Sequence, residues 1–169
     1  MPSPFGLSIK VTKNDLTPDL NRKLRAVSNP APIWKAVGTQ LVSLTKRAFR
    51  DSTLRQTAWP AKSDGSASNL IYKGVLLSSI RITAVDTRGV TIGSDRPYAA
   101  IHQLGGVIRP KKKKCLVFTI GGKTIFARQV TIPARPFFPF TPDGQLASVA
   151  REPVREIVDL AARKALGIS

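Results

Sequence analysis

Few residues of this chain could perform chemistry, and their spacing does not bring them together. His102 is the single histidine and Cys115 the single cysteine among 169 residues. His102 could act as a general base or a metal ligand, but a metal site would need carboxylates or Cys115 at a suitable spacing, which the sequence lacks. No serine lies in a Gly-x-Ser-x-Gly turn. We therefore expect His102 to form hydrogen bonds or packing contacts, and we predict no enzymatic activity, no metal and no cofactor.

Two further patterns invite a chemical interpretation. Cys115 follows four lysines, which would lower the pKa of an exposed thiol, but we favour a small buried residue in an apolar strand. Gly122-Lys123-Thr124 matches the end of a phosphate-binding loop. That loop needs a glycine five positions before Gly122, where Val117 stands, and a helix after it, where the pattern predicts a strand. The match therefore fails on both counts.

The only low-complexity patch is the run Lys111, Lys112, Lys113 and Lys114. These lysines could contact nucleic-acid phosphates, which would give salt-dependent affinity without sequence preference. The run contains none of the aromatic residues that stack on bases. The alternatives are a solvated basic tip or contact with an acidic protein partner, and all three interpretations stay open.

Two longer runs are distinctive because their residue types fix a shape. The first is Arg96-Pro97-Tyr98-Ala99-Ala100-Ile101-His102-Gln103-Leu104-Gly105-Gly106, and the second is Pro133-Ala134-Arg135-Pro136-Phe137-Phe138-Pro139-Phe140. Proline fixes φ and removes a donor, so the second run can be neither a helix nor a central strand. Its phenylalanines either lie buried under the last helix or form an exposed apolar ridge that docks into a neighbouring subunit.

Within the first run, we expect Tyr98–Gly106 to form a tight connection that sets the angle between two hairpins. Together with a long polar loop over residues 50–69, the two runs supply the candidate partner interface. Its residues are Trp59, Tyr98, His102, Gln103, Arg135, Phe137, Phe138 and Phe140.

The charge is strongly positive and unevenly distributed. The net charge is +17. Residues 1–60 hold ten Lys or Arg against three acids (+7), residues 61–140 hold thirteen against three (+10), and residues 141–169 hold four of each (zero). Such a field favours polyanions, either nucleic acid or an acidic face of a partner protein. No stretch approaches the ~20 apolar residues that span a bilayer and no secretion signal opens the chain, so we expect no membrane association.

The elements that must position these residues begin with a strand over 7–12, where apolar and polar residues alternate. A helix over 15–27 follows, with Pro18 in its first turn and a cap at Asn14 or Asp15. Residues 28–32 break the chain. An apolar stripe at helical spacing then predicts a helix over 33–49.

The second half of the chain reads mainly as β structure. Residues 70–79 form a short helix or turn, 80–93 a hairpin, and 106–109 and 129–132 extended pieces. Residues 115–120 and 123–127 flank Gly121-Gly122 as a second hairpin. A helix over 153–166 has Pro153 in its first turn and ends at Gly167. We predict an α+β fold in which an antiparallel sheet of hairpins packs against three segregated helices. We expect residues 1–30 to form an N-terminal strand-helix arm, and residues 31–169 to form one domain with a long loop at 50–69.

Four pieces, in this order, resemble the tailed-bacteriophage virion morphogenesis family, whose members are also called tail completion proteins. They span roughly residues 34–140, and residues 7–28 lie outside them. The pieces are Trp59 before a polar loop, the segment Lys73–Ile80, the run from Ile92-Gly93-Ser94 into Tyr98–Gly106, and Ile132–Phe138.

The resemblance implies a structural virion protein of the phage neck, made in the host bacterial cytoplasm, that joins or completes the tail at the head–tail interface. It implies a homo-oligomeric ring, with a connector, tail terminator or tail tube as partners and non-specific contact with DNA in the channel. The main alternative is a basic nucleic-acid-binding protein, and a more remote one is a hydrolase that uses His102.

Overall fold

The computed structural model describes residues 6–12, 18–25, 27–62, 65–141 and 143–166. The predicted cap at Asn14 or Asp15 and the predicted helix end at Gly167 lie outside these ranges. The elements in chain order are β1 (Leu7–Thr12), α1 (Pro18–Arg25), α2 (Ala31–Ala48), a 3-10 turn η2 (Ser52–Leu54), α3 (Val75–Ser79), β2 (Arg81–Val85), β3 (Gly89–Ser94), α4 (Ala99–Leu104), β4 (Gly106–Ile108), β5 (Leu116–Ile120), β6 (Lys123–Ala127), β7 (Val130–Ile132) and α5 (Ser148–Leu166).

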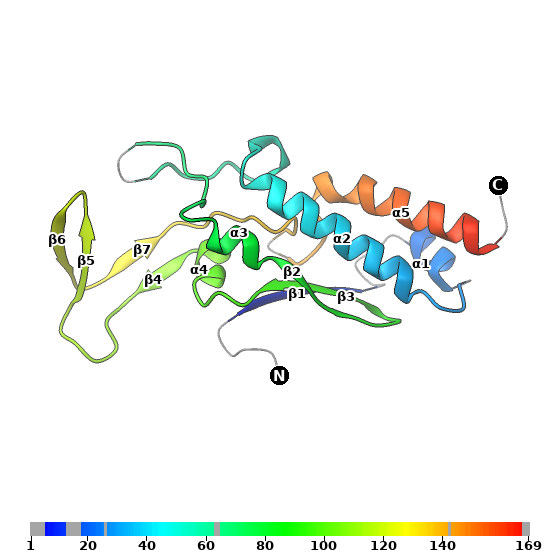
Figure 1. Ribbon diagram of the computed structural model, residues 1–169, viewed down its shortest axis with the longest axis horizontal. Helices are drawn as coiled ribbons and strands as arrows, with labels where there is room; N and C mark the ends of the chain where they lie inside the picture. The colour runs from blue at the N-terminus through cyan, green and yellow to red at the C-terminus, as the bar shows by residue number, and fades with distance from the viewer. Residues whose placement is uncertain (1–5, 13–17, 26, 63–64, 142, 167–169) are drawn as a thin grey trace.

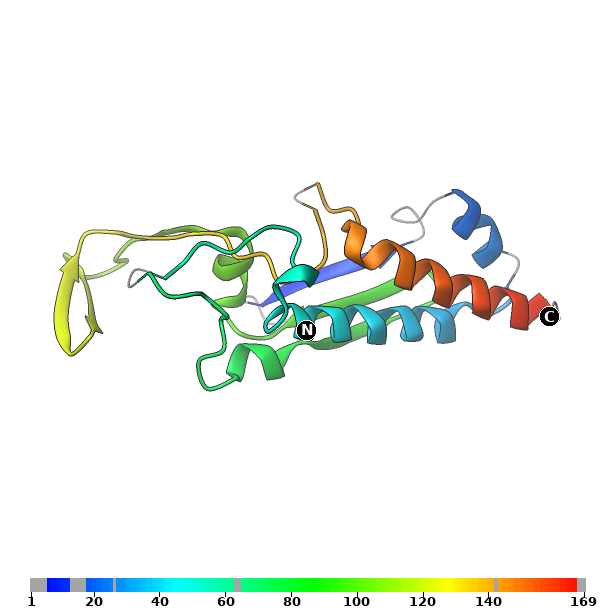
Figure 2. The same ribbon diagram turned by 90° about the horizontal axis from the view of Figure 1, so that it is seen from above.

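The body of the molecule is a three-stranded antiparallel sheet covered by helices (Figures 1 and 2). The strand order is β1-β3-β2, and α2 lies against β2 and β3 while its other side contacts α5. Trp34, Val37 and Leu41 of α2 are fully buried. A side chain at Gly38 would lie 2.5 Å from Val90 Cγ2, so glycine at this position allows the helix to approach the sheet closely.

The N-terminal segment is packed into this body. β1 pairs with β3 along its full length, from Leu7 opposite Ser94 to Thr12 opposite Gly89. Val11 and Leu24 are fully buried in the common core. Lys23 Nζ lies 2.5 Å from Asp159 Oδ1, which links α1 to α5. These contacts join residues 7–12 and 18–25 to the rest of the domain, while the boundary at residue 30 stays a prediction.

The predicted α+β class with antiparallel strands is confirmed, and the strands divide among three sheets. Two are small ladders, β4 with β7 and β5 with β6. The two-residue turn between β5 and β6 has positive φ at Gly121 and Gly122, +55° and +78°, as such a hairpin requires. The ladders form a projecting segment, residues 106–132, which we call the arm, and the other described residues form the body (Figure 1).

Two sequence expectations are wrong in detail. Helix α5 begins at Ser148, so Pro153 lies inside the helix instead of in its first turn. Because proline has no N–H, the helix lacks one backbone hydrogen bond at this position. Ala150, Val154 and Val158 are fully buried on one face of the helix, and their burial offsets that loss. The run 98–106, expected as a tight connection, contains the short helix α4, which ends at Gly105 with φ +71°.

Among the described helices, none combines the length and the apolar character that a membrane crossing requires.

Candidate functional site

Gln103 holds the two shape-fixing runs together. Its side chain lies on α4 and is 7% exposed. Its Oε1 accepts hydrogen bonds from the backbone N–H groups of Phe137 and Phe138, at 2.9 and 3.0 Å. The carbonyl of His102 also accepts a bond of 2.7 Å from the N–H of Arg135. One side chain therefore satisfies two buried donors that proline-rich backbone could not pair in a sheet.

Arg135 binds the long loop to these runs. Its side chain is 8% exposed, and its Nε and Nη2 each donate a 3.0 Å hydrogen bond, to the carbonyls of Pro60 and Ala61. A buried guanidinium needs compensating partners. Here the carbonyls of Pro60 and Ala61 are those partners. The guanidinium of Arg135 therefore holds this part of the long loop in place.

Trp59 adds a third connection. Its Nε1 donates a 2.8 Å bond to the carbonyl of Pro136, and its ring meets Phe49 edge-on at 5.8 Å. The guanidinium of Arg55 lies 4.0 Å from the centre of the indole ring, a cation–π contact. We call Trp59, Gln103 and Arg135, with the backbone groups they bind, the clasp. It joins the loop, α4 and the second run at the root of the arm.

The phenylalanines of the second run are core residues. Phe137, Phe138 and Phe140 are all buried, and the ring of Phe137 lies 5.3 Å from Phe49 and 4.8 Å from Phe138. The exposed-ridge interpretation is therefore wrong for these side chains, and the buried alternative is the one observed. The physical reason is that Gln103 holds the backbone, which turns the rings into the core beside the end of α2.

His102 and Tyr98 lie at the surface between body and arm. Their rings are in edge-on contact at 6.0 Å. His102 Nδ1 is buried and has no hydrogen-bond partner among the described residues. Burial lowers the pKa of the imidazole below its usual value, and the positive charge of Arg135 lowers it further. Both effects favour the neutral form of the imidazole.

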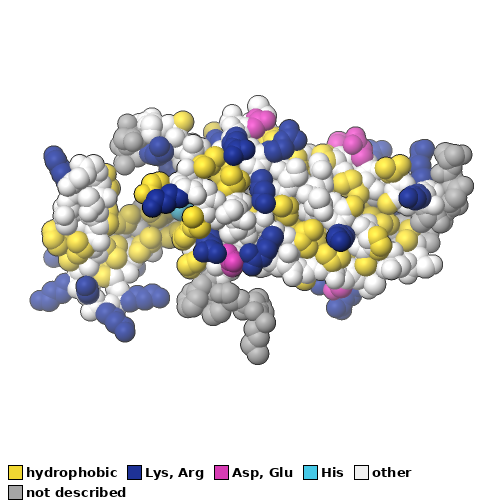
Figure 3. Space-filling view, in the orientation of Figure 1, with side chains coloured by type: hydrophobic (Ala, Val, Ile, Leu, Met, Phe, Trp, Pro, Cys, Tyr) yellow, Lys and Arg dark blue, Asp and Glu magenta, His cyan; other side chains and the backbone are white. Residues whose placement is uncertain are grey.

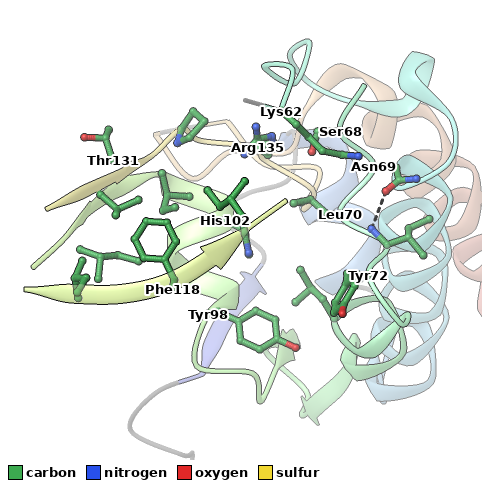
Figure 4. Close-up of a pocket in the computed structure, with 18 of the residues that line it drawn as sticks. Lys62, Ser68, Asn69, Leu70, Tyr72, Tyr98, His102, Phe118, Thr131 and Arg135 are labelled. Atoms are coloured by element: carbon green, nitrogen blue, oxygen red, sulfur yellow. Dashed lines mark hydrogen bonds between the residues drawn. The ribbon is translucent and has the colours of Figure 1, made fainter. Parts of the chain in front are cut away.

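A groove of about 1070 Å³ separates the arm from the body at this point. Figure 4 shows Phe118 and Thr131 of the arm on one side of His102, with Leu70 and Tyr72 on the other. The lining residues are mostly apolar: Lys62, Ser68, Asn69, Leu70, Ile71, Tyr72, Leu76, Tyr98, His102, Ile108, Leu116, Val117, Phe118, Ile120, Val130, Thr131, Ile132, Pro133 and Arg135.

The four lysines lie outside the groove. Lys111, Lys112, Lys113 and Lys114 are exposed in the loop that joins β4 to β5. They are not at the tip of the hairpin, because Gly121-Gly122 forms that turn. Figure 3 shows Lys and Arg side chains spread around this end of the molecule.

The sequence-based candidates omitted the exposed apolar surface of the arm. Val117, Ile120, Ile125 and Phe126 are between 37% and 69% exposed. The sequence feature that could have indicated this surface is the unbroken apolar run Leu116-Val117-Phe118. Such a run is typical of a strand that is covered on both faces. In the structure β5 and β6 form a separate two-stranded sheet, and these four side chains stay largely exposed.

Trp59, Gln103, Arg135 and His102 come together around the root of the arm, and the groups most exposed there are apolar or basic. The described residues contain no cluster of three or more His, Cys, Asp or Glu side chains that could hold a metal ion. The geometry is that of a rigid support with a projecting surface.

Two comparisons with known proteins find similarity over most of the chain. A model of the Phage virion morphogenesis family matches residues 11–158. The protein called "Mu-like prophage FluMu G protein 2", from Haemophilus influenzae, is 27% identical over 131 residues, which covers 78% of this chain and 81% of that protein. No solved structure gives a significant match.

Proposed function

This chain belongs to the phage virion morphogenesis family, and from that premise we propose that it is a structural protein of the phage neck. In this proposal it joins or completes the tail at the head–tail interface by assembling into a ring. The proposal includes no catalytic activity. Its partners are other neck and tail proteins, such as a connector, a tail terminator or the tail tube.

The arm on its fixed root is the observation that carries the proposal. Residues 106–132 project from the body and expose apolar side chains (Figures 1 and 3). The clasp attaches the base of the arm through buried hydrogen bonds of Gln103, Arg135 and Trp59. An element that presents apolar area on a fixed root is suited to contact a partner protein of the neck or tail. In this proposal the ring itself forms through separate head-to-tail contacts between copies, which close when the rotation permits.

A second candidate function, non-specific nucleic-acid binding, is favoured by one observation. The arm carries seven Lys or Arg residues and no acid. In a ring, these cations would contact phosphates of DNA passing along the axis. The measurement that separates this function from the first is retention of the purified protein on duplex DNA as salt is raised. A steep log–log slope, corresponding to several released counterions, favours DNA binding.

The joining role is tested by deleting the coding sequence from its phage and imaging the lysate by electron microscopy. The proposal predicts filled heads and separate finished tails, with tailed particles restored when the protein is supplied in trans. Normal tailed, infectious particles in the deletion lysate would contradict it. A supplied Leu160→Gln variant is the matched control, because Leu160 is 72% exposed on α5, a helix that lies on the side of the molecule away from the arm (Figure 1).

A further inference from the structure

The β5–β6 hairpin of the arm is apolar on both faces. Leu116, Phe118 and Ile120 alternate along one face and line the groove. On the opposite face Val117 and Phe126 stand directly across from each other, 55% and 69% exposed, and Val117 also contributes to the lining of the groove. An isolated two-stranded hairpin is only marginally stable in water. A hairpin with a paired valine and phenylalanine in solvent therefore indicates a surface that becomes covered.

The arm that carries this hairpin is basic, and its sequence supplies no acidic residue to neutralise the charge. Its cations are Arg109, Lys111, Lys112, Lys113, Lys114, Lys123 and Arg128, and its sequence holds no Asp or Glu. Among the residues that the structure describes, none of these seven has a carboxylate partner. The covering partner must supply apolar area and negative charge together.

We propose that the arm docks onto a different protein, through a surface with an apolar centre and an acidic rim. The Val117–Phe126 pair would occupy the centre, and the lysines of the β4–β5 loop would meet carboxylates at the rim. This inference rests on the proposed function, since it takes the partner from the neighbouring proteins of the assembled particle. The proposed interface thus lies on the arm, whereas the sequence analysis had placed it on Phe137, Phe138 and Phe140.

Two other occupants fit these observations less well. Duplex DNA would contact the cations but leave Val117 and Phe126 in water, because its outer surface consists of phosphates and sugars. A second copy of the chain is opposed by charge: the net charge of +17 less the +7 of the arm leaves +10 on the remaining residues. Charges of one sign on both surfaces disfavour that contact.

Site-specific photo-crosslinking in particles tests the proposal. p-Benzoylphenylalanine replaces Phe126 in one preparation and Leu160 in the other, positions of similar exposure on the arm and on α5. We expect the Phe126 probe to crosslink to a peptide of another virion protein that is rich in Asp and Glu. Crosslinks to DNA, to a second copy of this chain, or to nothing while the chain is present in particles would overturn the proposal and leave the joining role standing. Absence of the unmodified chain from particles would overturn both.

A double substitution gives a readout that does not depend on the probe. Val117→Thr with Phe126→Thr keeps strand-forming residues and matches Thr119 and Thr124 on the same face. Loss of two buried apolar contacts should reduce incorporation of the chain into particles at least about tenfold. The Leu160→Gln variant should be incorporated normally. The unfolding temperatures of the double variant and of the Leu160→Gln variant show whether both are folded. If both are unchanged and the double variant is incorporated normally, docking through this face is refuted.

Discussion

The clasp and the arm use their residues in opposite ways. In the clasp, polar and aromatic side chains are buried, and their hydrogen bonds go to the chain's own backbone. In the arm, apolar and basic side chains are exposed and few contacts reach the body. The most distinctive sequence motifs therefore build the support. The plainer hairpin between them carries the exposed apolar side chains.

This contrast has a physical basis. A support must resist displacement, and a buried hydrogen bond that cannot be replaced by water resists it well. A docking surface must exchange solvent for a partner, so its apolar groups stay accessible until assembly. Substitutions should therefore separate the two regions: clasp variants lose stability, and arm variants lose assembly.

The largest expected effect is on the buried rings. Phe137→Ala should lower the free energy of unfolding by about 3–5 kcal/mol, because it removes a ring packed between Phe49 and Phe138. Phe126→Ala on the arm removes the same kind of side chain from an exposed site. This substitution should change the free energy of unfolding by less than about 0.5 kcal/mol. Urea denaturation of the two variants measures both. Equal losses would remove the distinction between the regions.

Gln103→Leu is expected to have the next largest effect. The substitution leaves the N–H groups of Phe137 and Phe138 buried without an acceptor. Two such groups cost roughly 2–4 kcal/mol. Gln129→Leu is the matched control, since Gln129 is exposed on the arm and its side-chain oxygen accepts from the exposed Arg109. If Gln103→Leu unfolds at the same urea concentration as the control, the clasp has no structural importance.

A smaller loss is expected for Trp59→Phe. Phenylalanine keeps most of the ring packed on Phe49 and removes the hydrogen bond to the Pro136 carbonyl. The free energy of unfolding should fall by about 1 kcal/mol. Limited proteolysis should also show faster cleavage in the loop of residues 50–69. An unchanged cleavage rate would show that Trp59 does not fasten this loop.

The smallest expected effect is a pH dependence at His102. The folded state lowers the pKa of this imidazole, so the unfolded chain binds a proton more readily. Stability is then lost as the pH falls below about 6.5, the ordinary pKa of histidine. Carboxylates such as Asp95, whose pKa is also lowered, act in a more acidic range. The difference in unfolding free energy between pH 7.5 and pH 5.5 should shrink in His102→Gln. An undiminished difference would assign the effect elsewhere.

The sequence was sufficient for elements with a regular pattern. Strand β1 and the β5–β6 hairpin were predicted almost to the residue, because period-two alternation and a Gly-Gly turn are local signals. Helix α4 was not predicted, since six residues hold too little of the helical period. Helix α5 was started too late because Pro153 was assigned to a first turn, and burial of Ala150 allows an earlier start.

The site was less accessible from sequence because its partners are distant or belong to the backbone. Gln103 was chosen as an interface residue, yet its acceptor serves N–H groups 34 and 35 positions away. Proline fixed the dihedrals near Phe137 but did not determine which way the ring points. The exposure of Phe126 depends on where the hairpin projects, which no local pattern records.

Hydrogen–deuterium exchange on the free protein and on purified particles tests the division between clasp and arm most directly. The account predicts rapid exchange of the amides of residues 116–127 in the free protein and strong protection in the particle, with the Phe137 and Phe138 amides protected in both. Unchanged rapid exchange in the hairpin after assembly, with new protection at Phe137 and Phe138 alone, would contradict it.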